Sequence, residues 1–323
     1  MIYDRFKTDL GMLDLLLRAL ETTIPVLVTV FLGLFLAGML MELGVLDRLS
    51  VLSKPLVSMA NLPSISASSF LVSLGSAVAA NSMIAEFKMR GAIDDRETVL
   101  CAMMNSIPVY IREIFTYQIP VVVPLLGPVV GLFYAGVFII TAIVKVLMVI
   151  ILGRLILRGR NGAEISWEAP RRNINSLDAT LKILRTQIRP FARISITYMA
   201  MTLLVLSLND HGFFDKLSVL PIAQTFGISP EALVPLTTYV ASPLIGLSML
   251  SPMIQSGSLT EIQAATVLML GSMFMLPIFA MKSMVPNYTA IFGPRVGLMI
   301  VAISTGLSVM VRAVFLLALL WIG

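Results

Sequence analysis

Residues 127–132 read GPVVGL and residues 293–298 read GPRVGL, at an offset of 166 residues (293 − 127). An earlier pair, GVLDRLSVL at 44–52 and GFFDKLSVL at 212–220, recurs at an offset of 168 residues (212 − 44). The first offset also aligns Ser76 with Ser242, Gly91 with Gly257, and Ser106 with Ser272. Since these matches keep Gly, Pro, Asp and Ser in order, the sequence indicates two homologous halves rather than apolar segments that match by chance. Duplicated halves are a common plan of membrane transport proteins.

The composition predicts that a lipid bilayer surrounds most of the chain. Hydrophobic residues make up 58% of the 323 residues, charged residues only 13%, and the mean hydropathy is +0.94. Soluble domains carry about 25% charged residues. We therefore expect a multi-pass protein of the cell membrane. The formal net charge of +5 favours lipid headgroups as the opposing surface, and no nucleic-acid partner is expected.

The residues that usually hold metals or perform catalysis are scarce. The chain has one cysteine, Cys101, and one histidine, His211, far apart in sequence. Walker, GxSxG, HExxH and CxxC motifs are absent from the sequence. We therefore expect no cofactor, no bound metal and no enzymatic activity. The neighbours Met103 and Met104 leave a metal-ion permease as a weaker alternative.

The distribution of apolar and polar segments predicts three parts. Residues 1–157 form a first membrane repeat, 158–192 a basic cytoplasmic linker, and 193–323 a second membrane repeat. The linker contains seven Lys or Arg against three acidic residues, which places it inside the cell by the positive-inside rule. Its second part, SLDATLKILRTQIRPF, is expected to be an amphipathic helix on the inner leaflet, followed by a crossing at 193–209.

Two stretches rich in small residues predict interrupted helices. Residues 65–90 contain Gly75–Ser76, and residues 231–251 contain Ser242–Pro243 at the matching place. If each stretch is a re-entrant hairpin, the two halves have inverted topology, and if each stretch spans the membrane, the repeats are parallel. The distribution of Lys and Arg does not separate the two arrangements. We favour an all-α polytopic membrane protein with two inverted-topology repeats and interrupted or re-entrant helices.

The interrupted helices are the first candidates for a solute-binding site. Unwound backbone at membrane depth is tolerated where it is buried in protein or lines a cavity, and helix ends there offer partial charges to a ligand. The alternative is that the small residues only allow close helix packing. The predicted substrate-binding residues are Ser76, Asn81, Ser82, Asn105, Ser106, Ser242, Ser248 and Ser272.

Charged residues inside apolar runs are the second set of candidates. Lys145 lies within FIITAIVKVLMVI, and the 166-residue offset takes it to position 311, beside Arg312. A charged side chain inside the hydrocarbon layer costs free energy, so its presence calls for an explanation. Either the two cations face the protein interior and form an anion site or a gating pair, or their long side chains extend to the membrane–water interface. Three further charged residues lie at the ends of apolar segments: Arg112, Glu113 and Lys282. They are either solvated or functional. In the functional interpretation, Glu113 neutralises Lys145 or binds a coupling ion.

The repeated unit resembles the Gate domain, also called the nucleoside recognition domain. The resemblance is carried by SLGSAVAANSMIAEF (73–87), GAIDDRE (91–97) and NSIP (105–108), and covers most of both halves. Gate domains occur in spore maturation membrane proteins, concentrative nucleoside transporters and the membrane part of ferrous iron transporters. In the last group two such units have opposite orientation, which the resemblance implies here. The chain lacks a GTPase domain and has no acidic residue in the second-half counterpart of NSIP.

These features lead to two hypotheses of function. The first is a small secondary-transporter-like protein that binds a polar or anionic small solute at the interface of the two repeats. The second is a non-transporting membrane assembly or signalling partner that docks through the basic segment 158–192. Either a second copy of the chain or another membrane protein is then the expected protein partner.

Overall fold

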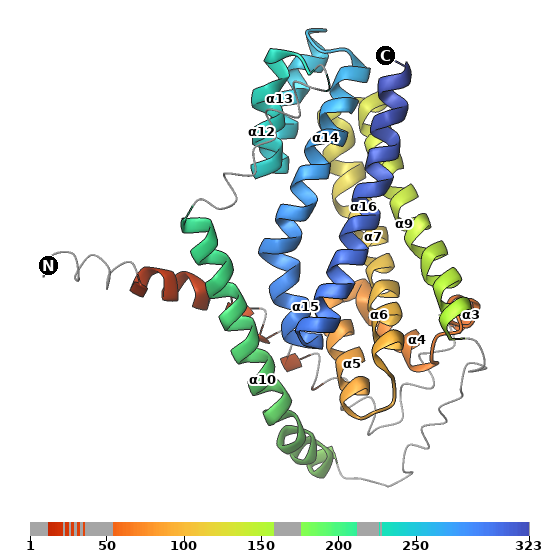
Figure 1. Ribbon diagram of the computed structural model, residues 1–323, viewed down its shortest axis with the longest axis vertical. Coiled ribbons are helices and arrows are strands. Elements are labelled where there is room, and N and C mark those ends of the chain that lie inside the picture. Colours follow the sequence, from red (N-terminus) through yellow and green to blue (C-terminus); the bar gives the residue numbers. More distant parts are fainter. Residues whose placement is uncertain are drawn as a thin grey trace, which may run out of the picture. The chain divides into compact units, whose positions relative to one another are not determined.

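The computed structural model describes residues 12–21, parts of 23–35, 54–157, 176–211, 226 and 228–322. These residues are mostly helical and include no strand (Figure 1). Within the described part of the chain, three helical runs are long and apolar enough to cross a membrane: α9 (Pro128–Ile156), residues Glu261–Phe292, and α16 from Pro294. The prediction of an all-α membrane protein is confirmed at this level. Both copies of the GxxDxLSVL motif, at 44–52 and 212–220, lie outside the described residues.

The remaining elements are mostly short. In chain order they are α3 (Lys54–Met59), α4 (Ile65–Gly75), α5 (Ala77–Met89), α6 (Asp95–Met104), α7 (Ser106–Glu113), the π-helical η2 (Ile114–Val122), α8 (Val123–Leu126), α10 (Ser176–Asp210), the short 3₁₀ turn η3 (Pro230–Ala232), α12 (Leu233–Ala241), α13 (Pro243–Gln255), α14 (Glu261–Phe279), the π-helical η4 (Ala280–Met284), α15 (Val285–Phe292) and α16 (Pro294–Ile322).

The chain forms two compact units, and each takes segments from both sequence halves. Unit 1 contains Met1–Val109, Leu147–His211 and Lys282–Val301. Unit 2 contains Tyr110–Val146, Gly212–Met281 and Ala302–Gly323. The long helices α9 and α16 contribute to both units. The boundaries of the compact units therefore differ from the boundaries of the predicted repeats. The repeats describe which segments are homologous in sequence, whereas the units describe which segments pack together.

In unit 1 the predicted interruption lies at Ser76, between α4 and α5. Ser76 has extended backbone (φ −149°, ψ 113°), and its hydroxyl accepts a hydrogen bond from the backbone N–H of Ala79 at 3.2 Å. Ser76 thus stops α4 and caps α5. After α5 the chain turns at Gly91, and Asp94 and Glu97 form a capping box that starts α6. The polar segment 91–97 is therefore a turn that leads into a helix start with both capping bonds made.

Unit 2 has a second interruption, at Ser242 between α12 and α13. Its backbone is again extended (φ −146°, ψ 99°), and Pro243 occupies the first position of α13. Proline suits that position because its missing N–H would have no partner inside the helix. Around this break, α12 packs against α13 and α14, and Leu236, Tyr239 and Leu247 form the buried centre.

The GPxxG motif explains how the long helices α9 and α16 begin. Gly127 and Gly293 have φ of +77° and +84°, a backbone region that favours glycine, and the following proline starts a 29-residue helix in each case. A methyl group on the second glycine would lie 2.6 Å from Val123 Cα in one copy and 2.5 Å from the Tyr288 carbonyl carbon in the other. The motif therefore specifies a sharp, closely packed turn into a long helix.

Helix α10 differs from the sequence prediction. The amphipathic stretch and the crossing at 193–209 are one continuous helix of 35 residues, Ser176–Asp210, which packs against α15. The first part of the predicted linker, 158–175, lies outside the described residues.

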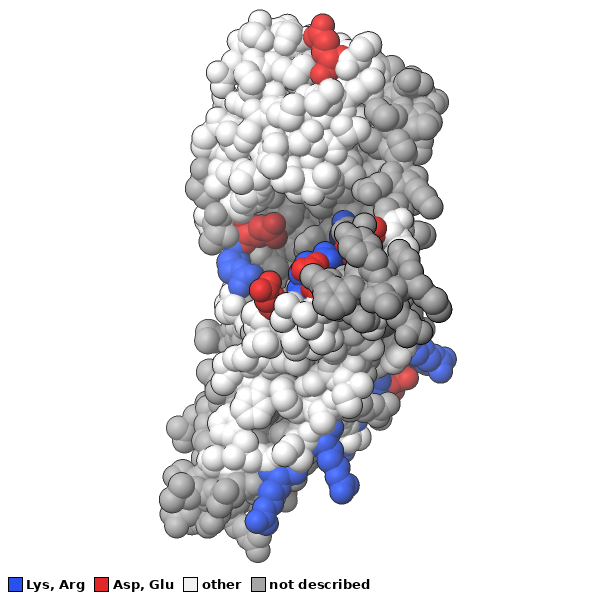
Figure 2. Space-filling model, turned by 90° about the vertical axis from the view of Figure 1, so that its left-hand side faces the viewer, with Lys and Arg blue, Asp and Glu red and all other residues white. Residues whose placement is uncertain are grey.

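Figure 2 shows a face on which wide areas of the described surface carry no charged side chain. On α9 the exposed side chains of Ile139, Ile143, Leu147 and Ile151 repeat every four residues, as expected for a lipid-facing stripe.

Candidate functional site

Two buried cations lie in unit 2, one on α9 and one on α16. Lys145 of α9 and Arg312 of α16 are only 3% and 4% exposed. The Lys145 ammonium donates a hydrogen bond to Ser304 Oγ at 2.7 Å and lies 4.7 Å from the centre of the Tyr110 ring. Both side chains are therefore enclosed by protein rather than extended into solvent. The Lys145–Ser304 bond also joins a helix of the first sequence half to a helix of the second.

Polar groups continue from Lys145 along one face of α16. Ser304, Ser308 and Arg312 are spaced by four residues, so they lie one above another on the helix. Ser308 Oγ donates to the Ser304 carbonyl at 2.9 Å, and Arg312 Nη1 donates to the Ser308 carbonyl at 3.0 Å. The Tyr110 hydroxyl of α7 lies 3.3 Å from Ser308 Oγ. We call Tyr110, Lys145, Ser304, Ser308 and Arg312 the cation cluster.

The cation cluster has no carboxylate at ion-pair distance. Among the described residues, no acidic oxygen lies within 4.0 Å of Lys145 or Arg312. Glu113, which is half-buried, interacts electrostatically with Arg112 and less strongly with Arg312. Arg312 Nε is buried and has no hydrogen-bond partner in the described part of the chain. The described part of unit 2 thus buries two basic groups, linked through Ser304 and Ser308, and offers neither of them a carboxylate at ion-pair distance, an arrangement suited to receiving an anion.

In unit 1 the structure brings three polar side chains together beside the Ser76 interruption. Ser69 Oγ of α4 donates to Asn105 Oδ1 at 3.1 Å, and Asn105 Nδ2 donates to Asn81 Oδ1 of α5 at 3.3 Å. All three residues are at least 97% buried. We call Ser69, Asn81 and Asn105 the amide network. Its hydrogen bonds connect α4, α5 and the end of α6, so it holds the interrupted helix in place.

The other predicted serines bond mainly within their own helices. Ser82 donates to the Val78 carbonyl, Ser106 to Met103 and Ser272 to Met269, all at 2.7–2.9 Å. Ser248 is exposed and donates to Leu244, and the Ser242 side chain makes no capping hydrogen bond. Of the predicted charged residues outside the cation cluster, Arg112 and Lys282 are exposed. Lys145 and Arg312 are the predicted charged residues that the structure places in one cluster.

Sequence reasoning missed several members of these groups. Ser304 and Ser308 precede Arg312 by eight and four residues, so helical spacing from a buried arginine could have indicated them. Tyr110 and Ser69 carry no comparable signal, because their partners lie on other helices. Tyr134 and Tyr239 were also unforeseen; their hydroxyls are 2.6 Å apart in the core of unit 2.

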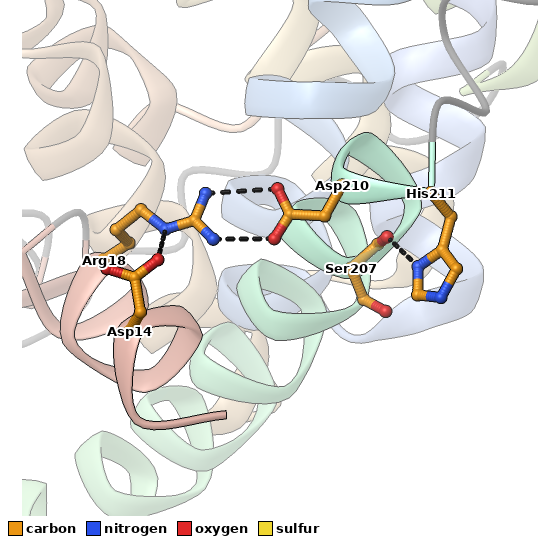
Figure 3. A network of polar contacts seen from close by, with 5 residues as sticks. All are labelled: Asp14, Arg18, Ser207, Asp210 and His211. Atoms are coloured by element: carbon orange, nitrogen blue, oxygen red, sulfur yellow. Dashed lines mark hydrogen bonds and ion pairs between the residues drawn. The ribbon is translucent and has the colours of Figure 1, made fainter. Parts of the chain in front are cut away.

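A separate polar contact joins the helical residues 12–21 to the end of α10 within unit 1. Arg18 donates Nη1 and Nη2 to the two carboxylate oxygens of Asp210 at 3.1 and 2.6 Å, and its Nε lies 3.0 Å from Asp14 (Figure 3). The Arg18 guanidinium holds the pKa of the Asp210 carboxyl below its ordinary value.

His211 Nδ1 lies 2.7 Å from the Ser207 carbonyl. The described residues contain no cluster of three metal-ligating side chains.

Comparison with known proteins identifies relatives but no function. No family model matches the chain, and no solved structure matches it. The uncharacterized proteins MJ0880 and MJ0871 of Methanocaldococcus jannaschii are 23% and 26% identical to it, over 89% and 93% of this chain and 94% of each relative. A third protein of that organism, the uncharacterized MJ1556, is 23% identical over 95% of this chain and 98% of its own length. The similarity therefore extends over nearly the whole chain.

Proposed function

We propose that the protein is a small secondary-transporter-like membrane protein that binds an anionic or polar small solute between helices of two homologous, inverted repeats. The observation that carries this proposal is the cation cluster. Its two basic residues come from helices that begin with the same GPxxG motif, one in each sequence half. Both are buried, and neither has an ion-pair partner among the residues that the structure describes. Intramembrane charges of this kind usually mark a substrate or ion pathway.

The duplication is supported by local geometry that recurs at the 166-residue offset. Both Ser76 and Ser242 interrupt a helix with extended backbone. Capping boxes start α6 and α14, at Asp94–Glu97 and Thr260–Gln263. Positive φ recurs at Gly91 and its counterpart Gly257, and at Gly127 and its counterpart Gly293. A π-helical segment precedes Gly127 in the first half and Gly293 in the second. Interrupted helices in paired repeats are typical of secondary transporters.

Solute counterflow into proteoliposomes tests the proposal. The purified protein is reconstituted with a panel of labelled solutes that includes succinate, phosphate, uridine and alanine. We expect counterflow of at least one anionic or polar solute, and a loss of at least tenfold in Arg312→Gln. Arg295→Gln serves as the matched control, since Arg295 is an exposed cation on the same helix. Circular dichroism and gel filtration check that each variant folds.

Two outcomes would overturn the proposal. One is the absence of counterflow for every solute with folded wild-type protein in the liposomes. The other is equal flux in wild type and Arg312→Gln. The first outcome would favour the alternative of a membrane assembly partner, which makes no use of a solute pathway. Such a partner would be sought by pull-down with and without residues 158–175.

A further inference from the structure

We propose that the solute of the cation cluster is a small organic carboxylate, whose two oxygens pair with the Nε and Nη2 edge of Arg312. The inference rests on the proposed function and deepens it, because it names the class of solute and the atoms that recognise it. It depends on Arg312, since arginine keeps its charge in proteins, and on hydrogen-bond donors for which the described part of unit 2 offers no acceptor.

The first observation is that one edge of the Arg312 guanidinium has no partner among the described residues. The side chain is buried, and its Nη1 donates to the Ser308 carbonyl at 3.0 Å. Its Nε is buried without a hydrogen-bond partner, and its Nη2 bonds to none of the described residues. The N–H bonds of Nε and Nη2 are parallel and match the two oxygens of a carboxylate. A bound carboxylate would supply both missing acceptors to a guanidinium that is costly to bury unsatisfied.

The second observation is that hydroxyl donors of unit 2 also lack an acceptor among the described residues. Ser304 Oγ accepts from Lys145, and no described group accepts the Ser304 hydroxyl proton. The hydroxyls of Tyr134 and Tyr239 lie 2.6 Å apart, so one donates to the other, and the second keeps a proton for which the described residues offer no acceptor. Tyr239 and Arg312 interact electrostatically. An ionised carboxylate only accepts hydrogen bonds, so it complements this excess of donors.

Glu113 does not supply the acceptors that the Arg312 edge lacks. Its carboxylate lies more than 4.0 Å from the Arg312 nitrogens. It also interacts more strongly with its neighbour Arg112 than with Arg312. The described residues therefore provide no carboxylate of their own for this edge, which favours a carboxylate from a ligand.

The apolar surroundings favour an organic anion over an inorganic one. Val311 and Leu316, on either side of Arg312 in α16, belong to the buried apolar core of unit 2 together with Tyr134 and Tyr239. Phosphate presents acceptor oxygens on every side, and would need more donors than one guanidinium edge and the neighbouring hydroxyls provide. A small organic acid presents two oxygens at one end and can place its carbon atoms against apolar side chains.

Calorimetry on the purified full-length protein in detergent tests the inference. Acetate, butyrate and succinate are titrated at one pH and equal ionic strength, each beside its neutral amide, which has nearly the same shape but no charge. Chloride and phosphate are the inorganic reference anions. We expect at least one of the three carboxylates to bind at least tenfold more tightly than its amide, chloride and phosphate.

The variants separate the guanidinium edge from the positive charge alone. Arg312→Lys keeps a cationic side chain but loses the paired donors, so it should bind the carboxylate at least tenfold more weakly, as expected for a lost charge-assisted hydrogen bond. Tyr239→Phe keeps the buried ring and removes one hydroxyl, and should bind at least threefold more weakly. It provides a second measurement if Arg312→Lys does not fold. Arg295→Gln should bind as wild type does, because Arg295 is exposed.

Three results would overturn the inference. The first is that none of the three carboxylates binds, and the second is that an amide, chloride or phosphate binds as tightly. The third is wild-type affinity in folded Arg312→Lys or, where that variant does not fold, in Tyr239→Phe.

Failure of the proposed function is distinguishable from failure of this inference. If the protein moves uridine or phosphate in liposomes but binds no carboxylate, the class of solute is wrong and transport stands. If a carboxylate binds and Arg312→Lys weakens it, but no solute crosses the liposome membrane, the site stands and transport is wrong.

Discussion

The two helix interruptions share a backbone but have different surroundings. At Ser76 the chain is supported by the amide network, in which Asn105 bonds to both Ser69 and Asn81. At the 166-residue offset, Ser69 and Asn81 correspond to Pro235 and Leu247, and Asn105 corresponds to Gly271. The space near Gly271 is filled by Tyr239, whose ring carbon Cδ1 would lie 2.7 Å from a methyl group at that position. One interruption is therefore held by hydrogen bonds and the other by packing.

This difference shows that an interrupted helix does not by itself require a polar core. The second interruption is stabilised by apolar burial, since Leu236, Tyr239 and Leu247 are all at least 99% buried. The prediction that serines of both halves line one polar site treats the two interruptions as equivalent. In the structure the polar character is concentrated at the first interruption and at the cation cluster, and each interruption should respond to a different substitution.

The largest effect is expected for Gly246→Ala at the second interruption. The new methyl group would lie 2.4 Å from Tyr239 Cα and Cβ, so α12 and α13 would have to separate. We expect the free energy of unfolding to fall by about 3 kcal/mol, as for strong overpacking. The measurement is SDS-induced unfolding in mixed micelles, followed by circular dichroism.

The first half provides the matched control for this substitution. The residue equivalent to Gly246 is Ala80, which is fully buried. Ala80→Gly should cost only about 1 kcal/mol, mainly from the lower helix propensity of glycine. Equal losses for the two substitutions would show that close packing is not what distinguishes the second interruption.

An intermediate effect is expected for Asn105→Leu at the first interruption. The substitution removes both hydrogen bonds of Asn105 and leaves Ser69 and Asn81 with buried polar atoms that have lost a partner. We expect a loss of about 2 kcal/mol in the same unfolding assay. Ser106→Ala is the control, because among the described residues the Ser106 hydroxyl bonds to the Met103 carbonyl, within a neighbouring turn of the chain, and does not join the amide network. A loss no greater than that of the control would mean that the amide network does not hold the first interruption.

The smallest effect compares the two interrupting serines directly. Ser76→Ala removes a cap that accepts a hydrogen bond from Ala79, and should cost about 1 kcal/mol. Ser242 makes no capping bond and Pro243 has no N–H to satisfy, so Ser242→Ala should be nearly neutral. Thermal unfolding of the two variants in detergent would separate them. A larger loss for Ser242→Ala would contradict the different roles assigned to the two serines.

Much of the fold could be predicted from residues with strong backbone preferences. Gly75–Ser76 and Ser242–Pro243 indicated both interruptions, and the repeated Gly127–Pro128 pair lies at the beginning of α9. These signals are local, since each depends on the φ and ψ that a residue tolerates or on a capping bond to a near neighbour. The helical continuity of α10 was missed because its first part is polar and its second part apolar, although both parts favour a helix.

The candidate site was predicted only in part, for a physical reason. Lys145 and Arg312 were indicated by their cost in an apolar run, which is visible in the sequence. Their contacts with Tyr110 and Ser304 depend on how three helices pack, and helix packing has no local signature. The same limit explains why Asn105 could be selected as a polar residue at depth while its partner Ser69 could not.

The length of the two helices that begin at GPxxG has a consequence for the surrounding membrane. At 1.5 Å per residue, 29 residues extend about 43 Å, whereas the hydrocarbon layer is about 30 Å thick. Such helices fit by tilting, by extending a turn or two into the headgroup region, or by locally thickening the lipid. The thickness of the host bilayer would then act on the same two helices that carry Lys145 and Arg312.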